Sequence, residues 1–70
     1  MVNTVVYEVL DIKCKCVNTC KDMDIEAGKT YYVDVRLLKT GETVFVVKLE
    51  DGSKLKCVQD WFADYFEITK

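Results

Sequence analysis

Alternation of apolar and polar side chains is clearest in residues 43–58, where two apolar-rich runs flank the dipeptide Asp51-Gly52. Asp-Gly tolerates the positive φ angles of a tight turn, and alternating hydrophobic residues on both sides of it are typical of a β-hairpin. The side chains predicted to face inward are Phe45, Val47, Leu49, Leu55 and Cys57. Those predicted to face outward are Val44, Val46, Lys48, Lys54 and Lys56.

Two segments near the N-terminus also favour β structure. In residues 12–17, Ile12, Cys14 and Cys16 point to one side, so we expect a half-buried strand with the cysteines on its inner face. Residues 4–10 are rich in β-branched side chains. They form either a separate strand or the first part of a longer, bent strand.

Residues 30–36 predict the next strand, again by alternation. Its inner face is predicted to carry Tyr31, Val33 and Val35, and its outer face Tyr32, Asp34 and Arg36. Leu37 and Leu38 either continue this strand or cap its end.

A long polar segment, residues 18–28, separates the first strand from this one. Met23 and Ile25 are its apolar members, and we expect both to anchor the loop to the core. Gly28 is predicted to close the loop in a conformation that residues with a Cβ resist.

The C-terminal part continues with short elements. Residues 39–42 predict a turn before the hairpin. Residues 59–64 lose the twofold alternation and predict a single helical or 3₁₀ turn capped by Asp60. Residues 65–69 predict a last short strand.

These elements define the fold class. No predicted helix is long enough to cover a sheet, so the sheet must curl on itself to enclose its apolar face. The sequence therefore predicts an all-β fold, a small five-stranded barrel with a long first loop and a short 3₁₀ turn before the last strand. Residues 1–70 are expected to form one domain, to which residues 1–11 would add an N-terminal strand extension.

The order of elements resembles an SH3-like β-barrel, with residues 18–28 as its first, diverging loop, Asp51-Gly52 as its distal loop and residues 59–63 as the 3₁₀ turn. More narrowly, the chain resembles small SH3-like proteins encoded by bacteriophages and prophages of Gram-positive bacteria. The matching stretches are Lys13-Cys14-Lys15-Cys16-Val17, Ile25 with Gly28-Lys29-Thr30-Tyr31-Tyr32-Val33, Asp51-Gly52-Ser53, and Phe62 or Phe66. The resemblance implies an accessory protein in the cytoplasm of the bacterial host that binds and modulates a host protein. Eukaryotic peptide-binding SH3 modules carry an Ala-Leu-Tyr-Asp-Tyr stretch that this chain lacks, so proline-motif recognition is not expected.

The net charge of −2 disfavours nucleic acid as a partner, because proteins that grip phosphates usually carry a basic excess or stripe. A nucleic-acid-binding barrel that uses Lys48, Lys54 and Lys56 with an adjacent aromatic residue is the second functional hypothesis. No apolar run approaches the ~20 residues of a membrane span, and the N-terminus lacks a basic signal-peptide region. We therefore expect a cytoplasmic location, no membrane partner and reduced cysteines.

The cysteines Cys14, Cys16, Cys20 and Cys57 supply the number of thiols that a structural zinc site needs. Their spacing does not give the two close pairs of a zinc knuckle. Three of the cysteines are explained as small buried thiols in a thin core, namely Cys14, Cys16 and Cys57. Cys20 is the exception, because it lies in a polar loop. Core cysteines are the favoured interpretation, zinc and a disulfide are the alternatives, and no cofactor is expected.

Catalysis is not expected from this sequence. The chain has no histidine, the usual general base near neutral pH, and it has no Gly-rich phosphate loop or Ser-centred nucleophile motif. Cys20 beside Lys21 is the sole candidate nucleophile. We therefore predict that the chain is not an enzyme.

Surface recognition is the remaining class of function. The aromatic residues Trp61, Tyr65 and Tyr32 would form a floor, and acidic residues of the long loop and the 3₁₀ turn would border it. These acidic residues are Asp22, Asp24, Glu26, Asp60 and Asp64. Such a surface suits a basic segment of a protein partner. The plainer alternative is that Trp61 only plugs the open end of the barrel.

A third hypothesis is a small structural subunit that self-associates, for example as a homodimer. The contact would run through Val44 and Val46 on an exposed strand, or through residues 1–10.

Overall fold

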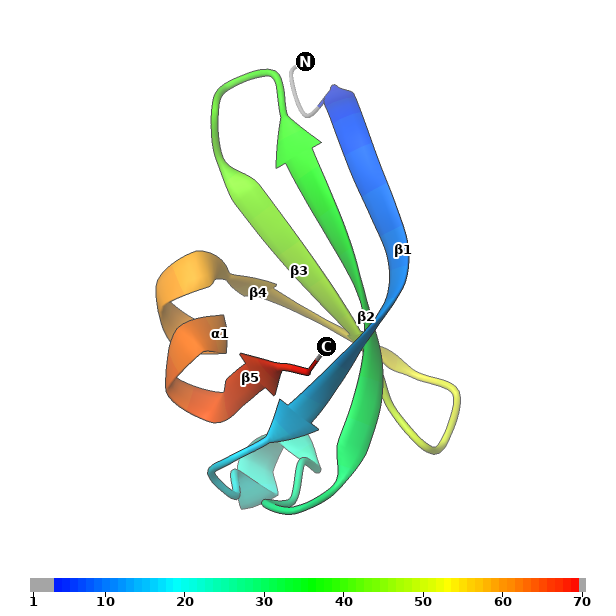
Figure 1. The fold of residues 1–70 in the computed structure, drawn as a ribbon, viewed down its shortest axis with the longest axis vertical. Helices are drawn as coiled ribbons and strands as arrows, with labels where there is room; N and C mark the ends of the chain where they lie inside the picture. Colours follow the sequence, from blue (N-terminus) through cyan, green and yellow to red (C-terminus); the bar gives the residue numbers. More distant parts are fainter. Residues whose placement is uncertain (1–3, 70) are drawn as a thin grey trace.

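The computed structural model describes residues 4–69, which form a five-stranded antiparallel sheet with one short helix (Figure 1). The sheet order is β4-β3-β2-β1-β5, and the sheet curls into a half-barrel. This confirms the all-β prediction. The elements are β1 (Val5–Cys16), the 3₁₀ helix η1 (Lys21–Met23), β2 (Thr30–Leu38), β3 (Thr43–Lys48), β4 (Lys54–Val58), α1 (Gln59–Tyr65) and β5 (Phe66–Ile68).

Strand β1 is long and bent, so the two N-terminal segments belong to one strand. Its pairing with β2 is interrupted by register shifts between Val5 and Tyr7 and between Val9 and Ile12. Asp11, inside the second irregularity, has a φ of 54°. Bulges of this kind increase twist and bend a strand. The C-terminal part of β1 can therefore close the curled sheet against β5 while the N-terminal part continues alongside β2 (Figure 1).

The core lies on the concave face of the sheet. Phe62 of α1 stacks on Phe45 of β3 with a centroid distance of 4.1 Å, and on Phe66 with 5.0 Å. Such stacked rings add to the free energy gained by burial. The buried cluster consists of Cys14, Cys16, Ile25, Tyr31, Val33, Phe45, Val47, Phe62 and Phe66. The inward positions predicted for the hairpin are confirmed, with Leu49, Leu55 and Cys57 partly buried against this cluster.

Two positions predicted to face outward are buried. Asp34 is 5% exposed and Val46 is 1% exposed. The bend of β1 explains the burial of Asp34. At this bend the backbone N–H of Asp11 donates to Asp34 Oδ1 at 2.9 Å. Val46 lies on a central strand and is the register partner of both Asp34 and Lys56, so neighbours on both sides shield it. Val46 therefore cannot provide the exposed contact considered for self-association.

The long loop is anchored at one of its two predicted positions. Ile25 is buried, whereas Met23 is 41% exposed. Gly28 adopts the predicted positive φ, 94°. Its N–H donates to the carbonyl of Cys16 at 2.8 Å, so the loop returns to the end of β1.

The helix is longer than the single helical or 3₁₀ turn predicted here. α1 is an α-helix of seven residues that includes Tyr65, and β5 starts at Phe66. Its N-cap is Val58 and no side chain caps it, so the capping role predicted for Asp60 is wrong. A helix this short depends on packing rather than on capping, and here Phe62 supplies that packing. At the other end of the sheet, Leu37 and Leu38 continue β2.

Candidate protein-binding site

An apolar groove lies where α1, β4 and η1 meet. Its volume is about 530 Å³ and its lining is almost entirely apolar. It is lined by Met23, Val44, Leu55, Lys56, Cys57, Val58 and Trp61. Met23 and Val58, which are 41% and 57% exposed, are large apolar residues on the surface. The groove is thus a surface on which an apolar side chain from outside could be buried.

Trp61 forms one wall of the groove. Its ring stacks on that of Tyr65 with a centroid distance of 4.3 Å and an interplanar angle of 25°. Both residues are half-buried and pack against the core cluster. They are separated by one helical turn on α1, which places them on the same face of the helix. Trp61 therefore packs against the core and also lines the groove.

Three of the predicted acidic residues lie on the elements that form this groove. Asp60 and Asp64 are exposed on α1, and Asp22 is exposed in η1 directly before Met23. The Nδ2 group of Asn18 donates to the backbone carbonyl of Asp64 at 2.6 Å. This hydrogen bond ties the start of the long loop to the helix.

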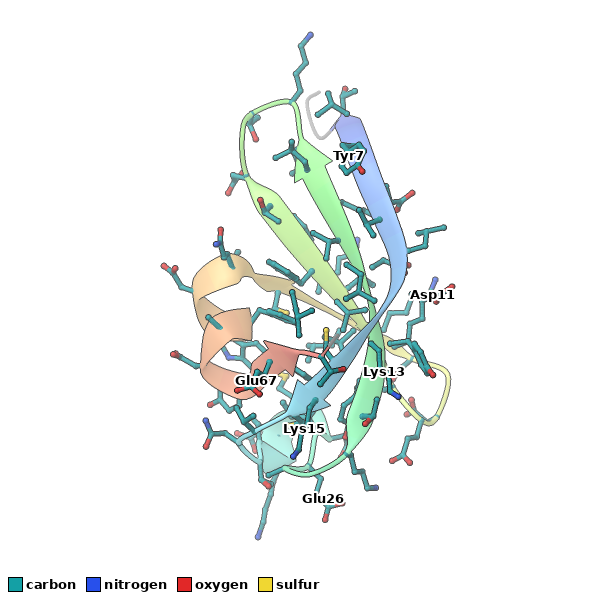
Figure 2. The ribbon with its side chains drawn as sticks, viewed as in Figure 1. Tyr7, Asp11, Lys13, Lys15, Glu26 and Glu67 are labelled. Carbon is teal, nitrogen blue, oxygen red and sulfur yellow. The ribbon has the colours of Figure 1, made fainter. Side chains whose placement is uncertain are left out.

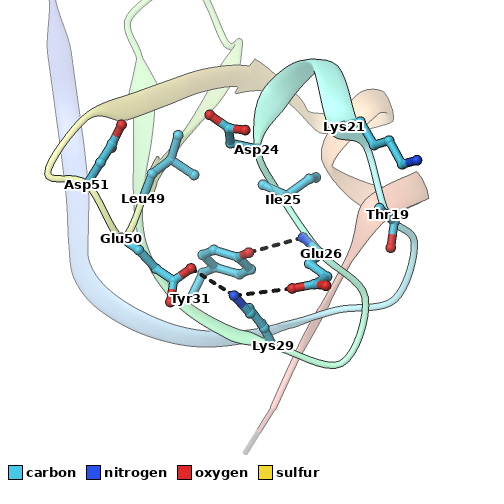
Figure 3. Close-up of a pocket in the computed structure, with 10 residues that line it drawn as sticks. All are labelled: Thr19, Lys21, Asp24, Ile25, Glu26, Lys29, Tyr31, Leu49, Glu50 and Asp51. Carbon is cyan, nitrogen blue, oxygen red and sulfur yellow. Dashed lines mark hydrogen bonds and ion pairs between the residues drawn. The ribbon is translucent and has the colours of Figure 1, made fainter.

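The other predicted residues lie elsewhere. Tyr32 is 51% exposed and is paired in register with Lys13 of β1 and Lys48 of β3, away from the groove. Asp24 and Glu26 line a second pocket of about 440 Å³ (Figure 3). The predicted recognition surface is therefore divided among three places.

The second pocket is organised around Lys29. Its ammonium lies 3.0 Å from Glu50 Oε1 and 3.2 Å from Glu26 Oε1 (Figure 3), and these hydrogen bonds hold the pKa of Lys29 above its usual range. The hydroxyl of Tyr31 accepts a hydrogen bond from the Glu26 N–H at 3.1 Å. The ion pairs are largely exposed, so each contributes little to stability. They link the long loop to the β3–β4 turn. Lys29 and Glu50 carry no sequence signal that distinguishes them from other surface charges.

Only part of the predicted basic patch is available to contact nucleic acid. Lys48 and Lys54 are opposite each other across β3 and β4, and Lys56 follows on the same face of β4. The ammonium of Lys48, however, is hydrogen-bonded to Asp11 and lies 3.2 Å from Asp34 Oδ1, and these contacts raise its pKa. Its charge is thus compensated within the chain, whereas among residues 4–69 no ion pair involves Lys54 or Lys56.

The cysteines behave as core residues at two of the four positions. Cys14 and Cys16 are fully buried, and burial raises the pKa of both thiols. Cys57 is half-buried, and burial raises its pKa to about 11. All four thiols, including the half-buried Cys20, are free. Across residues 4–69, no group of three His, Cys, Asp or Glu side chains has an arrangement that could hold a metal ion.

The fold and the groove define a small all-β domain with an apolar surface site. Comparison with known proteins gives no match to a family model, to a curated protein or to a solved structure. In the described part of the chain, no helix has the length and apolar character needed to cross a membrane. Function must therefore be inferred from the side chains themselves.

Proposed function

We propose that this chain is a non-enzymatic protein-interaction module that binds an apolar side chain of a partner protein in the groove between α1, β4 and η1. The observation that carries the proposal is the groove itself. Val58 and Met23 present large apolar side chains to solvent beside the partly buried ring of Trp61. Burying such a surface is favourable by about 25 cal/mol per Å² of apolar area.

The charge around the groove favours a basic partner segment. The exposed carboxylates of Asp22, Asp60 and Asp64 lie on the same elements that form the groove. Complementary charge at a rim mainly raises the association rate and selects the orientation of the partner, while a buried apolar anchor supplies affinity. The proposed ligand is therefore a protein segment in which one bulky apolar residue is flanked by Lys or Arg.

The proposed context is that of the phage-type SH3-like proteins, in which the chain would modulate a host protein in the bacterial cytoplasm. The strand order β4-β3-β2-β1-β5, the long loop after β1 and the tight β3–β4 hairpin support the SH3-like assignment. Burial raises the pKa of Cys14, Cys16 and Cys57, which disfavours these three thiols as nucleophiles. A nucleophilic thiol needs the opposite shift.

A random peptide library selected on the immobilised protein tests the proposal. We expect enriched peptides with a bulky apolar residue beside Lys or Arg, and binding that weakens as salt is raised. In Val58→Asn, affinity should fall at least about tenfold, since the groove loses one apolar wall. Asn is favoured at an N-cap, so this variant keeps the start of α1 intact.

Val6→Asn on β1 is the matched control, because Val6 is also an exposed valine but does not line the groove. Trp61→Ala should also lose the peptide, and circular dichroism will show whether the fold survives. Selected peptides that bind Val58→Asn and the wild type equally would refute the groove as the site. Enriched peptides without basic residues would refute the proposed basic partner segment.

One observation favours the second candidate function, nucleic-acid binding. Lys13, Tyr32, Lys48 and Lys54 follow one another in register across β1, β2, β3 and β4 on the outer face. An exposed aromatic ring among cations is a stacking platform for single-stranded bases. The internal pairing of Lys48 weakens this candidate. Fluorescence anisotropy with a labelled single-stranded oligonucleotide at low salt tests it, and absence of binding there would remove it.

A further inference from the structure

The N-terminal half of β1 is an unprotected sheet edge. In the described residues, β5 pairs with Cys14, Lys15 and Cys16 only, and no strand covers the same edge along residues 5–12. Figure 1 shows this half of β1 at the side of the molecule with β2 as its one neighbour, and Figure 2 shows Tyr7 at its end. An edge strand of this kind offers a row of unpaired backbone N–H and C=O groups.

Apolar side chains cover both faces of this edge. Tyr7 is 65% exposed and Leu10 is 58% exposed. Tyr7 and Leu10 are joined by further exposed apolar residues along the strand and on its neighbour β2. These are Val5, Val6, Val9 and Leu37. Monomeric domains rarely leave so continuous an apolar stretch in water.

The other edges of the sheet carry features that discourage pairing, and β1 does not. Lys54 and Lys56 alternate along β4, and lysine on an edge strand opposes association. Strand β5 has only three residues. On β1, the acidic residues Glu8 and Asp11 are each paired with a cation of the same chain, Arg36 at 2.6 Å and Lys48. The edge therefore presents no uncompensated charge to an incoming strand.

We propose that the occupant of this edge is a second copy of the chain, with the two β1 strands paired antiparallel about a twofold axis. A strand that adds here must be apolar on both faces, and β1 itself meets that requirement. A twofold axis makes the interface self-complementary, so each copy covers the other's residues 5–10. The pairing joins the two sheets into one continuous sheet. Registers that place the two Glu8 side chains opposite each other are disfavoured, because like charges directly across a strand pair destabilise it.

Sedimentation equilibrium of the full chain between about 10 µM and about 1 mM tests the proposal, because an interface built mainly on one strand lies at the small end of protein interfaces and is weak. The dimer fraction should rise with concentration in the wild type. Leu10→Lys should reduce the association constant at least about tenfold, because it removes an apolar contact and adds charge at the edge. Leu10 is exposed, so this variant should keep its thermal midpoint.

Val58→Lys is the control, with the same added charge at an exposed apolar position of β4. It should dimerise like the wild type. Hydrogen exchange gives a second readout, since amides of residues 5–10 should become more protected as the concentration rises, except in Leu10→Lys. A wild type that stays monomeric throughout would overturn the proposal. So would a dimer lost in Val58→Lys but kept in Leu10→Lys, or a monomer whose β1 amides are protected only by another protein's strand.

Discussion

Asp34 carries the buried charge among residues 4–69, and its replacement is the sharpest test of what stabilises the outer face of the sheet. Its Oδ1 accepts the Asp11 N–H at 2.9 Å and lies 3.2 Å from the Lys48 ammonium. Asp34→Ala removes the acceptor and leaves the Asp11 N–H at the bend of β1 without its partner. Asp34→Asn keeps an oxygen that can accept the same hydrogen bond and removes only the charge.

Asp34→Ala should lower the free energy of unfolding more than Asp34→Asn does. A hydrogen bond to a charged group contributes about 1.5–3 kcal/mol, and we expect Asp34→Ala to lower the free energy of unfolding by about 2–3 kcal/mol. Asp34→Asn should cost roughly 1 kcal/mol. For a domain of this size, each kcal/mol lowers the thermal midpoint by about 4–8 °C. Asp34→Ala should therefore lower it by roughly 10–20 °C.

The pH dependence of the free energy of unfolding shows whether the charge of Asp34 stabilises the fold. The Asp11 N–H, together with Lys48, lowers the pKa of Asp34 below its ordinary value. A group with a lowered folded-state pKa stabilises the fold above its unfolded pKa, about 3.9, and this stabilisation is lost as pH falls through the folded-state pKa. The difference in unfolding free energy between wild type and Asp34→Asn should be constant above about pH 5 and shrink below about pH 4.

Urea unfolding of both proteins over this pH range measures the difference, and the other carboxylates cancel because they are present in both. Asp60→Asn, an exposed position on α1, is the control and should change little at any pH. A difference that persists unchanged to about pH 3 would show that the stabilisation does not come from the carboxylate charge. No difference at neutral pH would refute the reasoning altogether.

Three further changes test the turn, the core and the thiols. Gly28→Ala should cost about 1–2 kcal/mol in urea unfolding, because Gly28 has a φ of 94° and its added Cβ meets open space, so the cost is backbone strain alone. Phe62→Ala should cost about 3–5 kcal/mol and leave little folded signal by circular dichroism, whereas Phe62→Leu should stay folded. Cys57, with its pKa near 11, should react with a disulfide reagent near pH 8 about a hundredfold more slowly than a free thiol, and rapidly once urea unfolds the chain.

The strands were predictable because alternation and turn chemistry agree. Asp51-Gly52 lies in the turn between β3 and β4 as expected, although only Gly52 of the pair has a positive φ, 91°, and the Leu49 N–H closes the turn on the Ser53 carbonyl. Phe45 pairs with Cys57 on the inner face. A twofold period assigns side chains to two faces and fixes which of them meet across a hairpin. These are local properties, so the sequence alone is sufficient for them.

Alternation does not say whether the second face is covered. Val46 and Asp34 lie on the outer side of the sheet as predicted, but both are buried there. The burial of Val46 depends on its register partners on β2 and β4. The burial of Asp34 depends on the bend of β1, which arises at bulges far from Asp34 in the sequence. The bend is a consequence of tertiary pairing, and no pattern within residues 30–36 or 43–58 encodes it.

The helix shows a second limit. Its seven residues have no side-chain cap, and a segment of this length is unstable in isolation. The ring of Phe62 between those of Phe45 and Phe66 holds the segment in a helical conformation. The contact with Phe45 joins residues far apart in the sequence, so local signals underestimate the helix and place Tyr65 in the following strand.

The candidate site was predictable in part, because some of its residues are close together in the sequence. Asp60, Trp61 and Asp64 are neighbours on one short segment, and their proximity follows from sequence. Tyr32 was grouped with them although its neighbours are Lys13 and Lys48, because the register of β2 with its partners decides where its ring lies. Residues on one short helix or one hairpin could be grouped correctly, whereas Tyr32, whose neighbours come from the pairing of β2 with β1 and β3, could not.

The groove and the β1 edge share no residue, and this separation has a consequence for function. The groove is built from η1, β3, β4 and α1, whereas the proposed dimer contact uses β1 with Leu37 of β2. Two copies paired through β1 would each keep a groove available for a partner segment. Binding to a surface that displays many copies of that segment would then be bivalent, with an avidity that exceeds the single-site affinity by roughly 10²–10⁴ when the geometry allows.

Leu10→Lys should therefore weaken binding to an immobilised partner peptide at high density while leaving its affinity for the same peptide in solution unchanged. The opposite pattern, equal loss in both formats, would mean that β1 contributes to the groove itself and that the two surfaces are not independent.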